Sequence, residues 1–197
     1  LVSSSAASDV YKRQQLKQIL SPVENSNGDI VLSASNGSRQ HLIVGDFTGH
    51  GLTAAIAGPL VSSLFYSNVN KGLAAEEILQ LINDELFNKL PVDKFLAATY
   101  VEWDKSRQKL TVFNFAMPPC LLIANERKVQ YFQSQALPLG VVEQVDYRKP
   151  LSTEFVTGDS LYIFTDGVVD AQNSDAEPFS VEKLEAVSYT HLTLPTT

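Results

Sequence analysis

The sequence of 197 residues has little cysteine, little positive charge and no long apolar run. Its single cysteine, Cys120, excludes an internal disulfide framework and is typical of a reducing compartment, so we expect a cytoplasmic protein. There are 22 acidic and 15 basic residues, a net charge of −7, which argues against nonspecific binding to nucleic acid. The longest apolar run, residues 54–61, contains Gly58 and Pro59 and is far shorter than the ~20 residues of a membrane span.

What is present indicates a folded domain. Hydrophobic residues make up 44% of the chain, which is too many for a disordered protein, and the length is enough for one domain with a real core. Residues 1–14 lack helical or strand periodicity, and residues 187–197 carry no charge and break an apparent helix that starts near Ser180. Both segments resemble translated sequencing-adapter read-through, with natural flexible tails as the alternative. We therefore expect one domain over residues 15–186, truncated and lying between two non-native tails.

Strand patterns joined by short turns dominate this domain. Asn36-Gly37 between two apolar runs is a strong hairpin signal, and residues 104–107 and 125–127 separate two further pairs of runs. The expected strands are residues 29–35, 40–46, 95–103, 108–115, 120–124, 128–132 and 160–165.

Two consecutive helices are predicted between the second and third strands. The first covers residues 53–70, where Pro59 should kink or restart it, and the second covers 74–86. The second helix is expected to pack through a face formed by Ile78, Leu81, Ile82 and Leu86.

Hairpins combined with this helical pair predict an α+β fold, in which a two-layer antiparallel β-sandwich is flanked by helices. A nucleotide-binding α/β protein would need parallel β-α-β alternation, which the consecutive hairpins contradict.

Three aspartates stand at ends of predicted strands: Asp29, Asp46 and Asp166. A carboxylate at the mouth of a buried strand loses hydration unless positive charge compensates for it. Three of them at one end of a sheet would suit Mg²⁺ or Mn²⁺, whereas Zn²⁺ would require cysteine and histidine ligands. Each aspartate taken alone is more simply explained as a turn-forming residue.

The segment GDFTGHG at residues 45–51 joins a predicted strand to a predicted helix. Its glycines allow the backbone to approach a metal or a phosphate closely. It is not a P-loop, because no Gly-Lys-Ser/Thr follows, and its glycine spacing differs from the dinucleotide-binding fingerprint.

With its neighbours, this segment resembles the bacterial SpoIIE/RsbU-like branch of the PPM-type metal-dependent serine/threonine protein phosphatases. GDFTGHGLTAA at 45–55 is similar to the family's GD-x-x-GHG-x-x-AA signature, and FTDGVVDAQ at 164–172 is similar to its TDG-x-x-E-A segment. NGD at 27–29, FLAAT at 95–99 and LPLGV at 137–141 match three further segments in the family's order.

The resemblance implies a centre of two divalent cations, Mn²⁺ or Mg²⁺, at one end of the sandwich. By motif position, Asp46 would bridge both metals and the Phe47 carbonyl would ligate one of them. Asp166 would ligate the other, and Asp29 would support the cluster directly or through water. His50 is a candidate general acid toward the leaving serine oxygen, or else a residue that only packs at the start of the helix.

The implied activity is hydrolysis of phosphoserine and phosphothreonine in bacterial signalling, by in-line attack of a metal-activated water. The implied substrate is a phosphorylated anti-sigma-factor antagonist, and a receiver or sensor domain would lie upstream in the full-length protein. The alternative is a catalytically silent phosphatase-like module of a response regulator that binds a partner.

Two departures from the family pattern qualify this implication. The family's N-A-G-H-P-P stretch reads NFAMPP at 114–119, so Ala116 and Met117 replace glycine and histidine and put substrate contacts in doubt. No D-D-x-T type motif follows Asp170 or Asp175, so one metal ligand and the last strand or strands would be missing, and we expect low or no activity from this fragment.

Other polar residues carry no assigned role. Lys94 and Arg107 could steer a phosphate, but charges that flank hairpins are usually solvated, and no substrate-binding residue is assigned. Cys120 is expected to be a buried core thiol, and His41 a surface or core position on a strand.

Overall fold

The computed structural model describes residues 28–49, 52–124, 129–145 and 150–169, together with Ser180 and Lys183. The predicted tails, both limits of the predicted domain and His50 lie outside these residues, as does any strand that would follow α3. Within the described part, no helix is both long and apolar enough to cross a membrane. The elements in chain order are β1 (Asp29–Asn36), β2 (Arg39–Phe47), α1 (Leu52–Lys71), α2 (Ala75–Lys89), β3 (Leu96–Asp104), β4 (Lys109–Phe115), β5 (Cys120–Ile123), β6 (Val129–Phe132), β7 (Leu151–Glu154), β8 (Ser160–Tyr162) and α3 (Asp166–Val169).

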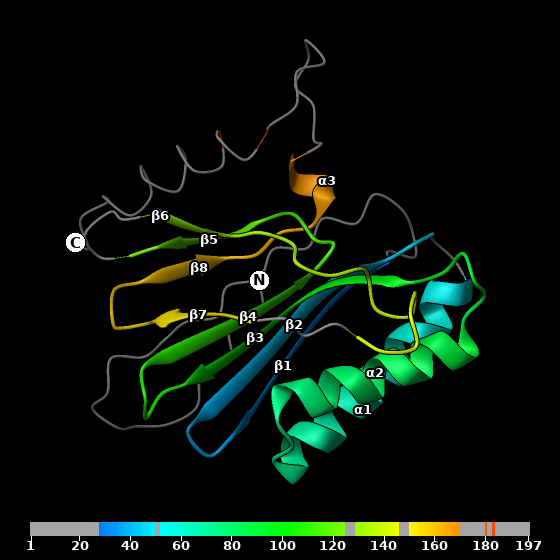
Figure 1. Cartoon of the computed structure of the whole chain (residues 1–197), viewed down its shortest axis with the longest axis horizontal. Helices are drawn as coiled ribbons and strands as arrows, with labels where there is room; N and C mark the ends of the chain where they lie inside the picture. Colours follow the sequence, from blue (N-terminus) through cyan, green and yellow to red (C-terminus); the bar gives the residue numbers. More distant parts are fainter. Residues whose placement is uncertain are drawn as a thin grey trace.

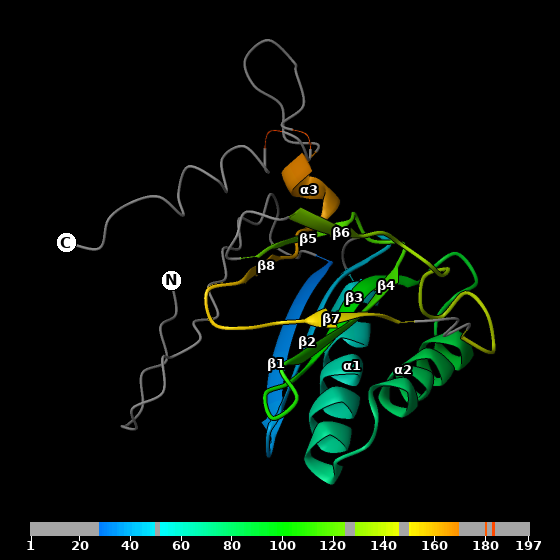
Figure 2. The same ribbon diagram turned by 60° about the vertical axis from the view of Figure 1, so that its left-hand side comes forward.

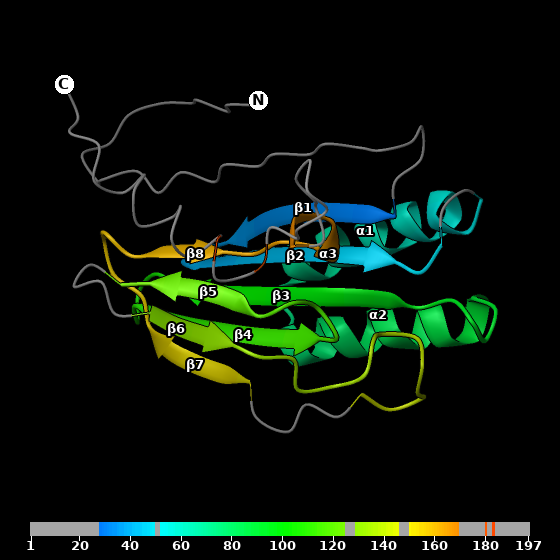
Figure 3. The ribbon, with the colours of Figure 1, turned by 90° about the horizontal axis from the view of Figure 1, so that it is seen from above.

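Two antiparallel sheets form the centre of the structure (Figure 1). The larger has the strand order β1-β2-β3-β4-β7, and the smaller has the order β6-β5-β8. The smaller sheet lies over the larger one when the molecule is seen from above (Figure 3). Helices α1 and α2 cover the opposite face of the larger sheet (Figure 2). The predicted α+β sandwich with flanking helices is therefore confirmed.

The two long hairpins are held by their turns. In the first, Asn36 pairs with Arg39, so Gly37 and Ser38 form a two-residue turn in which Gly37 has a φ of +58°. In the second, the Asp104 carboxylate accepts hydrogen bonds from the Ser106 hydroxyl at 2.6 Å and the Ser106 amide at 3.0 Å. These two predicted hairpins are confirmed, and their turns fix the register of the strands that carry the candidate site. The antiparallel pairing of β5 with β6 confirms the third.

Helix α1 continues through Pro59, so the helix does not restart there, and the kink given as the other possibility stays a prediction. The missing amide of a proline and its clash with the preceding turn cost about 3 kcal/mol in a helix interior. A stripe of fully buried residues at four-residue spacing runs through α1: Ala57, Val61, Phe65 and Val69. Each large side chain in such a stripe contributes roughly 1.5–3 kcal/mol when buried, which outweighs the local cost of Pro59.

Helix α2 packs through a face that differs in one residue from the predicted one. Ile78, Ile82 and Leu86 are fully buried as expected, but Leu81 is 39% exposed and Leu79 is buried in its place. At 100° per residue, Leu79 lies nearer than Leu81 to the centre of the stripe formed by the other three. The helix begins with the Ala74 amide donating to the Glu77 carboxylate at 2.9 Å.

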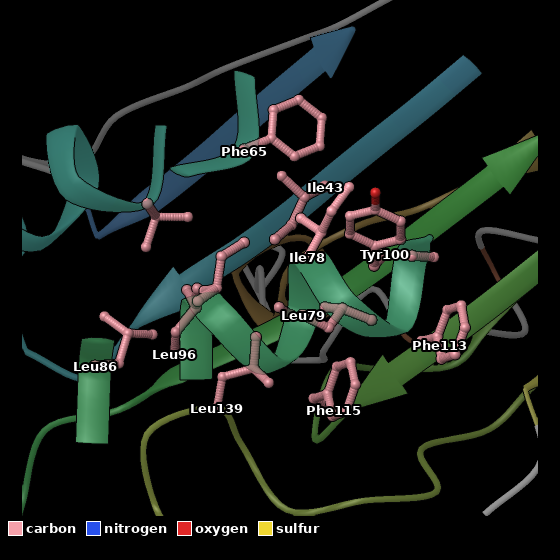
Figure 4. Packing of buried hydrophobic residues seen from close by; sticks show 14 of the residues in the cluster. Ile43, Phe65, Ile78, Leu79, Leu86, Leu96, Tyr100, Phe113, Phe115 and Leu139 are labelled. Carbon is pink, nitrogen blue, oxygen red and sulfur yellow. The ribbon is translucent and has the colours of Figure 1, made fainter. Parts of the chain in front are cut away.

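The main core lies between the helices and the larger sheet, where Ile43, Phe65, Tyr100 and Phe113 gather (Figure 4). A second apolar cluster lies on the other face of the same sheet: Val101, Leu110, Val112, Cys120, Leu122 and Phe132. Cys120 is 1% exposed, which confirms the predicted buried thiol. His41 is also buried, so it is a core residue, and its Nδ1 lies 2.8 Å from the Tyr100 hydroxyl.

Candidate functional site

Asp29 and Asp46 lie directly opposite each other in the ladder of β1 and β2. Directly opposed residues of an antiparallel pair project to the same face, with Cβ atoms roughly 4.5–5.5 Å apart. Asp29 is the first residue of β1 and Asp46 is the second-last of β2, so the hairpin register brings the two carboxylates to one end of the sheet. Two of the predicted metal ligands therefore meet.

Asp166, which follows the last strand of the smaller sheet, influences Asp29 and Asp46 through its charge. Strand β8 ends at Tyr162, and Asp166 begins the short helix α3. Just before it, the Thr165 hydroxyl forms a hydrogen bond with the Asp29 carboxylate that works to lower its pKa. The negative charge of Asp166 contributes to raising the pKa of both Asp29 and Asp46. The third predicted aspartate thus belongs to the same electrostatic cluster.

Burial and mutual repulsion oppose the charged forms of these carboxyls. Partial burial is the largest cause of the raised pKa of Asp46, about 6, followed by the charges of Asp29 and Asp166. Burial also raises the pKa of Asp29, while the hydrogen bond from Thr165 works in the opposite direction. A cation placed among the three would favour their ionised forms and reverse both effects.

Gly28 leaves room for two oxygens of the site. A Cβ atom at Gly28 would lie 2.5 Å from Asp46 Oδ1 and 2.7 Å from the Phe47 carbonyl oxygen, so both oxygens face the side of Gly28 that carries only hydrogen. The Phe47 amide donates to the Gly28 carbonyl at 3.1 Å, which holds the two segments together. The Phe47 ring is buried in the core, so its backbone is the part that belongs to the candidate site.

The donor set fits a hard divalent cation, since carboxylates, a carbonyl oxygen and water suit Mg²⁺ or Mn²⁺. Among the described residues, no three His, Cys, Asp or Glu side chains come close enough together to form a metal site by themselves. Mg²⁺ commonly keeps several water ligands, so one or two carboxylates with the Phe47 carbonyl and water would complete its coordination. The predicted roles of Asp29, Asp46, Phe47 and Asp166 as ligands stay predictions.

The segment after Phe47 is attached to the start of β3. The Thr48 amide donates to the Phe95 carbonyl at 3.0 Å, and the Phe95 amide donates to the Thr48 hydroxyl at 2.9 Å. Gly49 follows with a φ of +84°, in the left-handed region that favours glycine. His50 comes next and lies outside the described residues, so its predicted role as general acid stays a prediction.

The loop that departs from the family pattern is held in an unusual backbone conformation. Ala116 has a φ of +60°, which is strained for any residue with a Cβ, and glycine stands at this position in the family motif. The Asn114 side chain holds the loop by donating to the Pro118 carbonyl at 3.0 Å and accepting from the Met117 amide at 3.0 Å. Met117 itself is buried, so the histidine of the family motif is replaced here by an apolar packing residue.

Sequence reasoning did not assign Gly28 or Thr48 to the site. Gly28 could have been recognised, because a glycine immediately before a candidate ligand often allows close backbone approach. The role of Thr48 in joining two segments depends on the pairing of β2 with β3, and the local sequence carries no signal for it.

The chain is similar in sequence to bacterial phosphatases of the SpoIIE type. The family model described as Stage II sporulation protein E (SpoIIE) matches residues 36–196. The phosphoserine phosphatase RsbP of Bacillus subtilis (strain 168) is 24% identical over 136 residues, which cover 67% of this chain and 34% of RsbP. The chain therefore spans about a third of the length of this curated relative.

Solved structures share the fold at low sequence identity. The SiaA-PP2C domain of Pseudomonas aeruginosa superposes with a TM-score of 0.71 and 17% identity, covering 84% of this chain and 67% of that one. RsbX in complex with magnesium has a TM-score of 0.60 and 18% identity, covering 85% of this chain and 80% of RsbX. The fold is that of a PP2C-type phosphatase domain, and with the family model matching most of its length the chain belongs to the SpoIIE family.

Proposed function

We propose that this domain hydrolyses phosphoserine and phosphothreonine in a protein substrate, with divalent cations bound at the end of the β1–β2 hairpin. The observation that carries the proposal is that Asp29 and Asp46 lie opposite each other in the β1–β2 ladder. The pKa values of both carboxyls are raised, and a bound cation would stabilise their charged forms. Membership of the SpoIIE family and similarity to the phosphoserine phosphatase RsbP support the reaction. The magnesium in the RsbX structure supports the use of a divalent cation.

Each residue of the proposed centre has a part. Asp46 would be shared by two cations, Mn²⁺ or Mg²⁺, which the Phe47 carbonyl, Asp166 and Asp29 would help to hold. Bound there, the cations would supply an activated water, orient the phosphoryl group and neutralise charge during in-line displacement. Thr165 orients the Asp29 carboxylate through its hydrogen bond, as partners of metal ligands commonly do. His50 donates a proton to the leaving serine oxygen.

The proposal extends to the cellular setting. The substrate is a phosphorylated anti-sigma-factor antagonist, and the domain, over residues 15–186, follows a receiver or sensor domain in a longer protein. The reaction takes place in the cytoplasm, which agrees with a single, buried, unpaired cysteine.

Phosphate release from a phosphoserine peptide tests the proposal. The full-length protein, which would supply the segment that this fragment is expected to lack, should release phosphate with Mn²⁺ and stop when EDTA removes the metal. Asp46→Asn should lower kcat by at least about 100-fold, because the amide is a poorer metal ligand than the carboxylate. Asp84→Asn, on α2, is the matched control and should retain the parent rate.

The same assay separates the alternative function. Ala116 and Met117, in place of glycine and histidine, are the observation that favours a catalytically silent module. Tight binding of a protein partner without any Mn²⁺-dependent phosphate release would establish that alternative and overturn the proposed hydrolysis.

A further inference from the structure

The segment that carries Asp46 and Phe47 is attached to the segment that carries Lys94. Besides the two hydrogen bonds between Thr48 and Phe95 described above, the Thr48 hydroxyl lies 3.3 Å from the Phe95 carbonyl oxygen. In the sheet, Asp46 pairs with Ala97 and Phe47 with Leu96, so Lys94 lies just beyond the end of β3 that adjoins the candidate metal site. Its position relative to that site is therefore set by backbone hydrogen bonds.

The side chain of Lys94 lies against Gly49. A Cβ atom at Gly49 would be 3.2 Å from Lys94 Nζ and 3.8 Å from Lys94 Cε. The ammonium group thus packs against the bare backbone of the loop that leads on from Asp46 and Phe47. Any larger residue at Gly49 would compete with the ammonium group for this space, in addition to the strain of its positive φ.

The other basic residues of the described core strands lie elsewhere. Arg39 and Lys109 both pair with Asp104, at the opposite end of the larger sheet from Asp46. Arg107 lies in the turn at that same far end, 3.7 Å from the Asp104 carboxylate. Lys89, on α2, is held by Glu85 at 2.7 Å. Among the basic residues that the structure describes, Lys94 is therefore the strand-flanking one that adjoins the candidate metal site.

The ammonium group of Lys94 is available to an anion. It forms an ion pair with the neighbouring Asp93, with 3.2 Å between Nζ and Oδ2, and that carboxylate is 75% exposed. An exposed pair of this kind is worth only about 0–1 kcal/mol, so a phosphate dianion can replace Asp93. Lysine is a compact charge that commonly binds phosphate, and Lys94 remains 29% exposed.

We propose that Lys94 binds the phosphoryl group of the substrate at the edge of the metal centre. The inference rests on the proposed function and adds to it a substrate-binding residue that the metal ligands do not provide. The bound cations would offset the charge of the three aspartates, and Lys94 adds positive charge on the adjoining loop. It contacts the substrate phosphate and takes no part in holding the cations.

The test compares Lys94→Gln with Lys94→Arg and with Lys89→Gln, a control that removes one ion-paired lysine from α2. The readouts are KM and kcat for a phosphoserine peptide at saturating Mn²⁺, and the inhibition constant of inorganic phosphate. Loss of one charge-assisted hydrogen bond should raise KM and the inhibition constant about tenfold in Lys94→Gln, with a smaller effect on kcat. Lys94→Arg should restore both to within about threefold of the parent. Equal constants for Lys94→Gln and Lys89→Gln would overturn the proposal.

A binding measurement separates this inference from the proposed function. If the full-length protein releases no phosphate with Mn²⁺, the proposed hydrolysis fails, and calorimetric titration of inorganic phosphate in the presence of Mn²⁺ then decides the role of Lys94. Binding that weakens about tenfold in Lys94→Gln but not in Lys89→Gln supports the role. Absence of phosphate binding to the parent, or unchanged binding in Lys94→Gln, contradicts it.

Discussion

Asp29 and Asp46 are paired residue for residue across the β1–β2 ladder, with Thr165 bonded to the first and the charge of Asp166 acting on both. Like charges directly opposite each other destabilise an antiparallel pair. The pairing of β1 with β2, which buries apolar side chains, nevertheless keeps the two carboxylates together. Their electrostatic repulsion therefore lowers the stability of the metal-free domain. Cation binding would release this repulsion, which couples metal binding to the stability of the domain.

The metal-free protein should become more stable when Asp46 is replaced by asparagine. The pKa of Asp46 is about 6 in the folded protein against an ordinary value of 3.8, so between these values the folded state holds a proton that the unfolded state has lost. The destabilising effect of Asp46 therefore grows as the pH rises from about 4 to 6 and is constant above that. Allowing for solvent screening, we expect Asp46→Asn to add on the order of 1 kcal/mol at pH 7 and nothing at pH 4.

Urea unfolding of the two proteins in EDTA, at several pH values, measures this difference. Saturating Mn²⁺ should reverse its sign, because the cation stabilises the parent more than the variant. If Asp46→Asn raised the free energy of unfolding equally at pH 4 and pH 7, electrostatic repulsion at Asp46 would not be the source of the gain in stability.

Gly28→Ala should disrupt the metal site. The new methyl group would lie too close to Asp46 Oδ1 and to the Phe47 carbonyl oxygen, and one of them would have to move. We expect Mn²⁺ affinity to fall by at least about tenfold, with a loss of stability on the order of 1–3 kcal/mol. Calorimetric titration with Mn²⁺ and urea unfolding check the two effects separately.

Gly37→Ala is the control for this substitution. Gly37 lies in the turn of the same hairpin, and a Cβ atom there would meet nothing within 4 Å. Its φ of +58° makes alanine cost about 1 kcal/mol, but Mn²⁺ affinity should be unchanged. A similar loss of Mn²⁺ affinity in both variants would mean that the hairpin, and not the contact at Gly28, controls the site.

Ala116→Gly should stabilise the protein. Relief of the left-handed strain at a φ of +60° is worth about 1–2 kcal/mol, and the added flexibility of the unfolded chain removes up to about 1 kcal/mol of this gain. We expect a net gain of about 0.5–1 kcal/mol in the free energy of unfolding. Ala136→Gly, which carries no positive φ, should lose stability in the same measurement, and a loss of equal size at Ala116 would contradict the strain.

His41→Gln should make the protein less sensitive to acid. Burial, and secondarily the charge of Arg39, lower the pKa of His41 from 6.5 to about 4, and Glu102 at 3.9 Å does not compensate. Between pH 6.5 and 4 the unfolded chain therefore binds a proton that the folded chain does not, so the stability of the parent falls as the pH decreases. Relative to the variant, the parent should lose on the order of 2 kcal/mol from pH 7 to pH 4.

Unfolding midpoints of both proteins at pH 7 and pH 4 provide the measurement. The variant removes the titration but also the contact with the Tyr100 hydroxyl, which shifts its stability equally at every pH. The difference between the two pH values therefore isolates His41, and a difference that stays constant from pH 7 to pH 4 would rule out its titration as a source of acid sensitivity.

The fold was largely predictable because its hairpins have strong local signals. Asn36-Gly37 and the turn at Asp104 indicate the hairpins β1–β2 and β3–β4. The edge strand β7 has only four residues, two of them exposed, and carries no such local signal. Strand β8 is shorter than the predicted 160–165, because the chain leaves the sheet after Tyr162 to place Asp166 at the start of α3. A restart at Pro59 was expected because its local cost was considered without the burial of the helix that contains it.

The aspartates of the candidate site could be proposed from the sequence because each stands beside a predicted strand. Their arrangement in space could not be proposed in this way. The pairing of Asp29 with Asp46 depends on the register of the whole β1–β2 hairpin, and the effect of the Asp166 charge on the pKa of Asp46 depends on the stacking of two sheets. The position of Lys94 against Gly49 depends on the β2–β3 pairing, which joins residues almost 50 positions apart.

Mn²⁺ titration of the parent and of Asp46→Asn, followed by electron paramagnetic resonance of the free ion, tests the central claim most directly. Because Asp46 is proposed to bridge both cations, the parent should bind two Mn²⁺ per chain and the variant should bind both at least about tenfold more weakly. Equal stoichiometry and affinity in the two proteins would contradict a metal centre built on the Asp29–Asp46 pair.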